Sequence, residues 1–257
     1  MYFSNFEQGI IRNICSFSSN NPKTLGELIV SIVFPKGRCG SVAFKNPEIF
    51  HLLCTEDYTN KLQENIIELD SLLTFLEDNR YVVTSQSKEF EWVTLFYNGA
   101  VTVFSQDQLI YLKKRDLPIG KRNTESYPIS PNLYLIIEQT IKDGFAISIA
   151  ARITKDDQPY LNQFDMDNKI MLRISKALAS YYYPTPKLRL LIDNGYKTEE
   201  ELYNEKVLLK ADCQISKANW ALILSFISIC ISIAGYFIDS LKDTIVISIA
   251  IFRLFGF

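Results

Sequence analysis

Apolar side chains recur every three or four positions in three stretches of the first eighty residues, which is the spacing of one face of a helix. The first apolar face comprises Phe3, Phe6, Ile10, Ile14 and Phe17. It predicts a helix over about residues 5–17. Thr24 and Glu27 have capping-box spacing and predict a second helix that ends before Pro35. A third face, within residues 59–79, consists of Leu62, Ile66, Leu69, Leu73 and Leu76.

The period changes from helical to alternating after the third predicted helix. Residues 80–85, 91–97 and 100–106 are predicted to be strands, and Asn98-Gly99 between the last two is a strong hairpin signal. Residues 36–48 are predicted to be a loop. Because three helices followed by an antiparallel hairpin is the element order of a winged-helix domain, the segment 1–110 resembles one. This resemblance rests on element order alone.

The middle segment, residues 111–197, is predicted to be a mixed α/β or helical part of the same cytoplasmic body. Its apolar stretch at 133–153 contains Glu138 and Lys142, so soluble elements are favoured over a bilayer span. These two residues are four apart, which suits the solvent side of a helix. Residues 145–153 fit a strand or a helix equally well. Two further helices are predicted, one at about 166–182 and a short one that ends near Gly195.

The strongest signal in the chain is the segment 219–238, which has twenty residues and no charge. A helix of this length reaches roughly 30 Å, the thickness of the hydrocarbon layer. Trp220 and Tyr236 lie near its ends, where amphipathic rings anchor a helix at the interface, and Lys217 precedes it. Cationic flanks favour the cytoplasmic side, so the sequence predicts an inner-membrane protein with its N-terminal body in the cytoplasm.

The flanks of this segment leave several alternatives open. Thr198 and Glu201 again have capping-box spacing, so one long helix or two collinear ones lead into the membrane, or a hinge lies near residues 217–219. Residues 244–257 reach only roughly 21 Å as a helix. We favour a hairpin in which they return as a short second helix and place Arg253 near the cytoplasmic face. The alternative is a re-entrant or interfacial tail.

Small side chains form a seam along the membrane segment. Its members are Ala218, Ala221, Ser225, Ser228, Ser232, Gly235 and Asp239, at steps of three and four residues. This is the average repeat of a left-handed coiled coil, and small residues let membrane helices approach closely. The seam has three interpretations: chance placement, packing against the second helix or another copy, and the serine-lined wall of a pore. A pore requires several copies.

Charge limits the partners of the body. The chain has 27 basic and 29 acidic residues, so it has no global attraction to nucleic acid. The third predicted helix carries Glu64, Glu68, Asp70, Glu77 and Asp78 against Lys61. A DNA-reading helix needs cations, so a protein partner is favoured over DNA. The only basic cluster consists of Lys113, Lys114, Arg115, Lys121 and Arg122. It is a solvated loop or a patch for anionic lipid or nucleic acid, and lipid is the better partner of the two.

Candidate catalytic residues are scarce. His51 is the single histidine and Cys54 is close enough to touch it on a helix, but a half-buried or surface histidine beside a core cysteine is the favoured interpretation. The aspartates within 163–169 lack the glycine and distal glutamate of a calcium loop and are interpreted as the start of a helix. We found no nucleotide-binding, nucleophile-elbow or zinc-protease motif. The sequence therefore predicts a non-enzyme without metal or cofactor.

The predicted fold class is α+β and mostly helical, with a winged-helix-like N-terminal domain, a mixed middle region and a C-terminal transmembrane helical hairpin in residues 198–257. This architecture resembles membrane effectors or accessory proteins of bacterial anti-phage defence systems. The resemblance implies an oligomer whose soluble part senses a protein partner or a signal ligand and whose hydrophobic part perturbs the lipid bilayer. The alternative is a membrane-tethered interaction module that binds a partner protein or DNA through its winged-helix-like domain.

Overall fold

The chain forms two units, Met1–Lys197 and Thr198–Phe257. The first is called the body here, and the predicted segments 1–110 and 111–197 both lie in it. The computed structural model describes residues 3–17, 22–45, 49–85, 90, 93–108, 122–142, 145–156 and 158–254. The fold is mixed α/β, with a large antiparallel sheet in the body and one long apolar helix in the second unit.

The helices of the body confirm the periodic patterns. They are α1 (Asn5–Cys15), α2 (Leu25–Val33), α3 (Thr59–Asp78), α4 (Asn168–Ala179) and α5 (Pro186–Asp193). Ser4 with Glu7 and Thr24 with Glu27 form complete capping boxes at the starts of α1 and α2. The apolar faces of all five helices join one hydrophobic core, which includes Ile10, Ile29, Leu69, Ile174 and Leu188.

Eight antiparallel strands make the main sheet, in the order β5-β4-β1-β2-β9-β8-β7-β6. Their bounds are β1 (Cys39–Phe44), β2 (Phe50–Cys54), β4 (Val93–Tyr97), β5 (Ala100–Phe104), β6 (Arg122–Ser130), β7 (Leu133–Lys142), β8 (Phe145–Lys155) and β9 (Gln158–Phe164). A second, two-stranded sheet pairs β3 (Val82–Thr84) with β10 (Tyr182–Pro184). Asn98 and Gly99 both have positive φ and form the predicted hairpin turn between β4 and β5.

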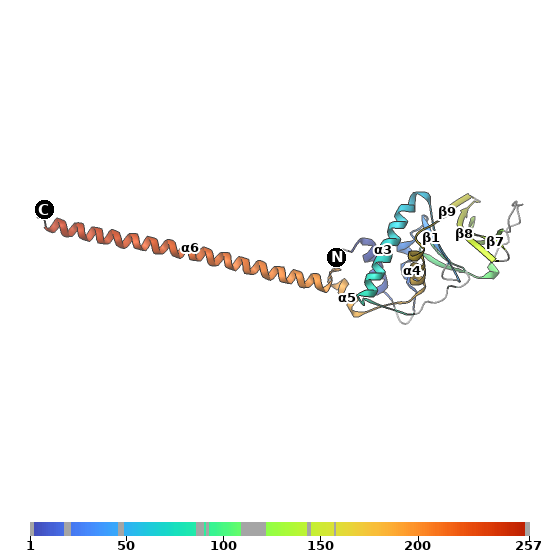
Figure 1. Cartoon of the computed structure of the whole chain (residues 1–257), viewed down its shortest axis with the longest axis horizontal. Coiled ribbons are helices and arrows are strands. Elements are labelled where there is room, and N and C mark those ends of the chain that lie inside the picture. Colours follow the sequence, from blue (N-terminus) through green and yellow to red (C-terminus); the bar gives the residue numbers. More distant parts are fainter. Residues whose placement is uncertain are drawn as a thin grey trace. The chain divides into compact units, whose positions relative to one another are not determined.

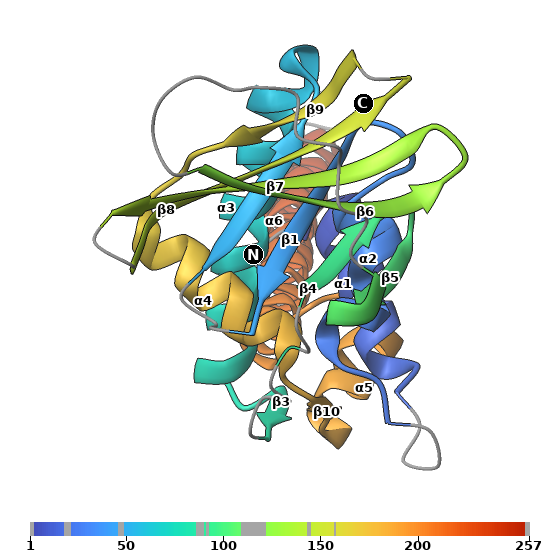
Figure 2. The same ribbon diagram turned by 90° about the vertical axis from the view of Figure 1, so that its right-hand side faces the viewer.

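The sheet folds over so that its central strands are buried on both faces. One face of β1, β2 and β4 contacts the helices through residues such as Ala43 and Leu52. The other face, with Val42 and Leu53, packs against apolar residues of β7, β8 and β9, including Leu135. Figure 2 shows β6 and β7 crossing in front of β1 and β4, with α3 behind them.

The structure does not show the winged-helix arrangement. Strands β1 and β2 stand between α2 and α3, and the β4-β5 hairpin is not a separate wing because β4 pairs with β1. The prediction of a loop at 36–48 was wrong over Cys39–Phe44. All six residues of β1 are buried, so the strand shows no alternation of polar and apolar positions. Because long-range packing buries both faces of β1, its sequence lacks the alternating pattern by which a strand is recognised.

The middle segment contains more strand than the mostly helical prediction allowed. Residues 145–153 lie in β8, and the helical interpretation of Glu138 and Lys142 was wrong because both lie on β7. Residues four positions apart share one face of a strand as well as one face of a helix, so the spacing of Glu138 and Lys142 fits both. Glu138 pairs with Arg152 of β8, with 2.8 Å between Oε1 and Nη2.

The second unit consists of one helix, α6 (Glu199–Leu254), which Figure 1 shows as an unbroken ribbon. Thr198 and Glu201 form the predicted capping box, since the Glu201 amide donates to Thr198 Oγ1 at 3.3 Å. The helix is continuous through residues 217–219, without a hinge. The predicted hairpin is not shown, because α6 continues through residues 239–243. Those residues include neither glycine nor proline, so the local sequence does not break the helix.

Candidate functional site

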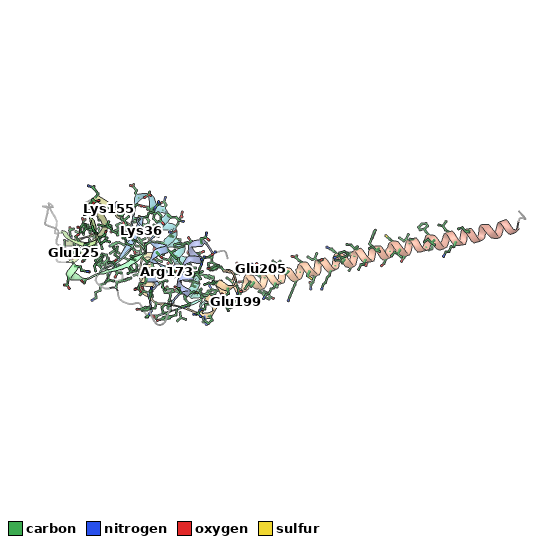
Figure 3. The ribbon with its side chains drawn as sticks, turned by 180° about the vertical axis from the view of Figure 1, so that it is seen from behind. Lys36, Glu125, Lys155, Arg173, Glu199 and Glu205 are labelled. Carbon is green, nitrogen blue, oxygen red and sulfur yellow. The ribbon has the colours of Figure 1, made fainter. Side chains whose placement is uncertain are left out.

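The apolar segment 219–238 of α6 exposes all of its side chains. Every residue from 219 to 238 is exposed, and among the described residues α6 contains the one span that is long and apolar enough to cross a membrane. Trp220 is 63% exposed and Tyr236 is 73% exposed, one near each end of the segment. In Figure 3 the side chains extend outward all along the helix, beyond Glu199 and Glu205 at its start.

The seam of small residues lies along one side of this exposed helix. Its residues from Ala218 to Gly235 are all exposed, and a Cβ added at Gly235 meets no atom within 4 Å. The Ser225 hydroxyl donates to the Ala221 carbonyl at 2.8 Å, and the Ser232 hydroxyl donates to the Ser228 carbonyl at 2.9 Å. The seam is therefore a shallow surface on which these two hydroxyls are bonded to their own helix.

Several predicted site residues fall where the structure gives no side-chain detail. Lys113, Lys114, Arg115 and Lys121 lie outside the described residues, and Arg122 opens β6 without a described side chain. The side chains of Asp239 and Arg253 are also outside the described set, although both positions lie within α6. Lys217 is exposed on α6, one turn before the apolar segment. The lipid-patch hypothesis thus remains a prediction.

Three residues of the acidic row on α3 contact other elements of the body. Asp70 forms an ion pair with Arg173 of α4. Glu77 Oε1 accepts a hydrogen bond from the Tyr182 hydroxyl at 2.5 Å, and Glu68 accepts one from the Ser4 hydroxyl. Burial, followed by the bond to Glu77, raises the pKa of Tyr182, so this hydroxyl keeps its proton. These contacts give three of the acidic residues a structural role, and the prediction that α3 does not read DNA stays a prediction.

The body also contains a pocket that the sequence did not reveal. It has a volume of about 320 Å³ and lies where β2 begins, β9 ends and α4 starts. Its polar lining residues are His51, Ser148, Gln163, Asp165 and Asn168. Its apolar lining residues are Ile49, Phe50, Ile149, Phe164, Met166 and Met171. Pairing of β2 with β9 brings these segments together, since Leu52 stands opposite Phe164.

His51 is the least satisfied polar group of the pocket. Its Nε2 atom is buried and has no hydrogen-bond partner in the described part of the chain. The ring lies edge-on to Phe44, with 5.8 Å between centroids. Burial lowers the pKa of His51, and the nearby Asp165 carboxylate opposes this effect. The imidazole is therefore neutral at pH 7, with one ring nitrogen able to donate and the other able to accept.

Gln163 holds Asp165 beside His51. Its Nε2 donates to Asp165 Oδ1 at 2.9 Å, and its Oε1 accepts from the Ala151 amide of β8 at 3.2 Å. Asp167 does not join the pocket. As predicted from the acidic stretch, it caps α4, since its Oδ1 accepts from the amides of Lys169 and Ile170. The pocket thus has one positioned carboxylate, Asp165.

His51 and Cys54 do not form a catalytic pair. They are three residues apart on β2, so their side chains point to opposite faces of the sheet. Cys54 joins the helix-side core, and burial raises the pKa of its thiol. A protonated, buried thiol is a poor nucleophile. Of the two positions left open for the histidine, half-buried or at the surface, the structure shows the half-buried one, and Cys54 lies in the core.

Comparison of the chain with models of protein families, with curated proteins and with solved structures found no match. The assignment of a function therefore depends on two features of the described chain. One is the exposed apolar helix α6. The other is the pocket beside His51.

Proposed function

We propose that this chain is a non-enzymatic, oligomeric protein of the inner, cytoplasmic membrane. In this proposal the body lies in the cytoplasm and receives a protein or ligand signal. Helix α6 crosses the bilayer, packs against other copies and perturbs or permeabilises the membrane. The observation that carries the proposal is the uncharged, fully exposed segment 219–238.

The energetics of exposure support insertion of this segment. Twelve large apolar or aromatic side chains of the segment are exposed: Trp220, Leu222, Ile223, Leu224, Phe226, Ile227, Ile229, Ile231, Ile233, Tyr236, Phe237 and Ile238. Removing one such side chain from water is favourable by roughly 1.5–3 kcal/mol, so transfer of the set is favourable by on the order of 20 kcal/mol. The backbone of a helix is already hydrogen-bonded internally, so a helix can enter lipid without leaving amides unsatisfied.

Charge and aromatic placement support the orientation. Lys210 and Lys217 precede the segment on the side of the body, and cationic residues concentrate on the cytoplasmic side of membrane helices. Trp220 and Tyr236 are placed for the two interfaces. Both features agree with a body that stays in the cytoplasm.

The seam supports association of several α6 helices. Small side chains let helix backbones approach closely, and the steps of three and four residues keep the seam on one side of each helix. A membrane-perturbing oligomer agrees with the architectural resemblance to anti-phage membrane effectors. That resemblance suggests the biological setting of the proposal.

A second candidate function is a membrane-tethered interaction module in which α6 only anchors the body. Hydrogen bonds from Ser225 and Ser232 to carbonyls of their own helix favour this candidate. A hydroxyl that is satisfied internally needs neither water nor a neighbouring helix. In this case the body binds its partner while the membrane stays sealed.

Dye release from liposomes tests the proposal with the full chain and two triple variants. Replacing Ser225, Ser228 and Ser232 with leucine covers the seam with bulk, whereas replacing them with alanine keeps the seam shallow and removes the hydroxyls. We expect the natural chain to release dye, and the leucine variant to lose both dye release and oligomerisation in detergent. If the serines line a water-filled wall, the alanine variant stays oligomeric but releases less dye.

The outcomes separate the two candidates. A monomeric natural chain that inserts into liposomes without releasing dye contradicts the membrane-perturbing function and supports the anchor. Equal dye release by the natural chain and both variants shows that the seam has no role. Flotation of each variant with the liposomes serves as the control for insertion.

A further inference from the structure

We propose that the pocket beside His51 binds a small molecule with a cationic amine head and a flat apolar body. This inference identifies a ligand class for the body, and it depends only on residues of the body. It therefore holds or fails independently of whether α6 spans a membrane.

The unpartnered nitrogen of His51 indicates a bound group. Buried polar atoms in native proteins nearly always have a hydrogen-bond partner, and an unsatisfied one destabilises the fold. His51 Nε2 is buried without such a partner among the described residues, and His51 is one of the residues that line the pocket. A ligand that reaches this nitrogen can donate to it or accept from it, because the neutral ring has both functions.

The charge of the pocket selects the head group of the ligand. Asp165 is the one acidic residue among the described lining residues, and neither lysine nor arginine occurs among them. An anionic ligand has no counter-charge there and meets a carboxylate. Gln163 already uses one oxygen of this carboxylate, which leaves the other to accept from an ammonium group. Electrostatics thus favour a cation and exclude phosphates and carboxylates as ligands of this pocket.

The walls of the pocket select the rest of the ligand. Phe50 and Met171 are buried, and Phe164 and Met166 are half-buried. Aromatic rings and polarisable thioethers contact flat rings well. A volume of about 320 Å³ is at the small end of ligand pockets, which suits a compact molecule better than a peptide. The geometry therefore suits an arylalkylamine.

Histidine NMR tests this assignment on the full chain in detergent, because the chain has one histidine. The protein is labelled at the imidazole, carries no histidine tag and is kept above pH 7, where His51 is neutral. Benzylamine, benzyl alcohol and benzoate present the same ring with cationic, neutral and anionic heads. We expect benzylamine to shift the His51 signal saturably, benzyl alcohol to bind more weakly and benzoate to leave the signal unchanged.

Two carboxylate variants make the test specific. Asp165→Asn removes the charge from the pocket and is expected to weaken benzylamine binding about fivefold, the upper range for an exposed ion pair. Asp193→Asn removes an exposed carboxylate from α5 and is expected to change nothing. Benzoate binding as tightly as benzylamine, equal binding by both variants, or an unmoved His51 signal overturns the assignment.

Discussion

At the scale of single residues, folding changes the pKa of His51, and this change can be measured as a pH dependence of stability. The folded body shields its ring from water, and burial lowers its pKa below the ordinary value of 6.5 against the opposing influence of Asp165. In the unfolded chain the ring takes up a proton as the pH falls through about 6.5, whereas in the folded chain it resists doing so. The stability contributed by neutral His51 is therefore present above about pH 6.5 and is lost as the pH falls below that value.

This linkage predicts a difference between the natural chain and His51→Gln. Between about pH 7.5 and pH 5.5 the natural chain is expected to lose up to about 1 kcal/mol more free energy of unfolding than the variant. Denaturant unfolding of both proteins at the two pH values measures this difference in the free energy of unfolding. Groups remote from position 51 are common to the two chains, so their contributions to the pH dependence cancel in the comparison. Identical pH dependence contradicts a shielded imidazole.

At the scale of elements, α6 presents two chemically different sides within one turn. Ser228 belongs to the seam, whereas Cys230 lies about 200° further round the helix, because each residue turns by about 100°. Both positions are exposed in the isolated chain. In the proposed packing of α6 helices through the seam, position 228, and not position 230, lies at the helix contact.

Cysteine cross-linking in membranes checks this arrangement with a natural control. In a Cys213→Ser background the existing Cys230 thiol is expected to give little disulfide-linked dimer on oxidation. Moving the thiol to the seam, by combining Cys230→Ser with Ser228→Cys, is expected to give mostly dimer, because the two sulfurs then approach within disulfide range. A dimer band that is as strong from Cys230 as from position 228 argues against packing through the seam.

At the scale of the whole molecule, the body and α6 differ in how much of their apolar surface they bury. The helices and the folded sheet of the body bury two hydrophobic cores, whereas the segment 219–238 of α6 buries none of its side chains. A unit with its own cores has what independent folding requires. We therefore expect the body to fold without α6.

Truncation after Lys197 tests this expectation. The shortened chain is expected to remain in the soluble fraction and to unfold cooperatively on heating. The full chain is expected to sediment with membranes and to resist extraction at alkaline pH, as inserted helices do. Recovery of the full chain in the soluble fraction contradicts membrane insertion, and an unfolded truncated chain shows that the body depends on α6. Circular dichroism and membrane fractionation provide the measurements.

Local signals in the sequence predicted the elements whose causes are local. The capping box of Thr24 and Glu27, the Asn98-Gly99 turn and the length of the apolar segment 219–238 each depend on interactions within a few residues of backbone. The capping box at Thr198 belongs to the same group. Among the candidate site residues, local signals identified the seam and the aromatic residues near the ends of the segment 219–238, but they did not identify the pocket.

The tertiary structure alone decided the sheet and the pocket. Strand β1 lacks an alternating pattern because it is buried on both faces, and it was therefore predicted to be a loop. The pocket forms because β2 pairs with β9, which places His51 beside Asp165 although more than a hundred residues separate them. The period and length of apolar segments are properties of neighbouring residues, so the sequence by itself determined the helices and the long apolar segment 219–238. Strand pairing and two-sided burial join distant residues, so they required the fold.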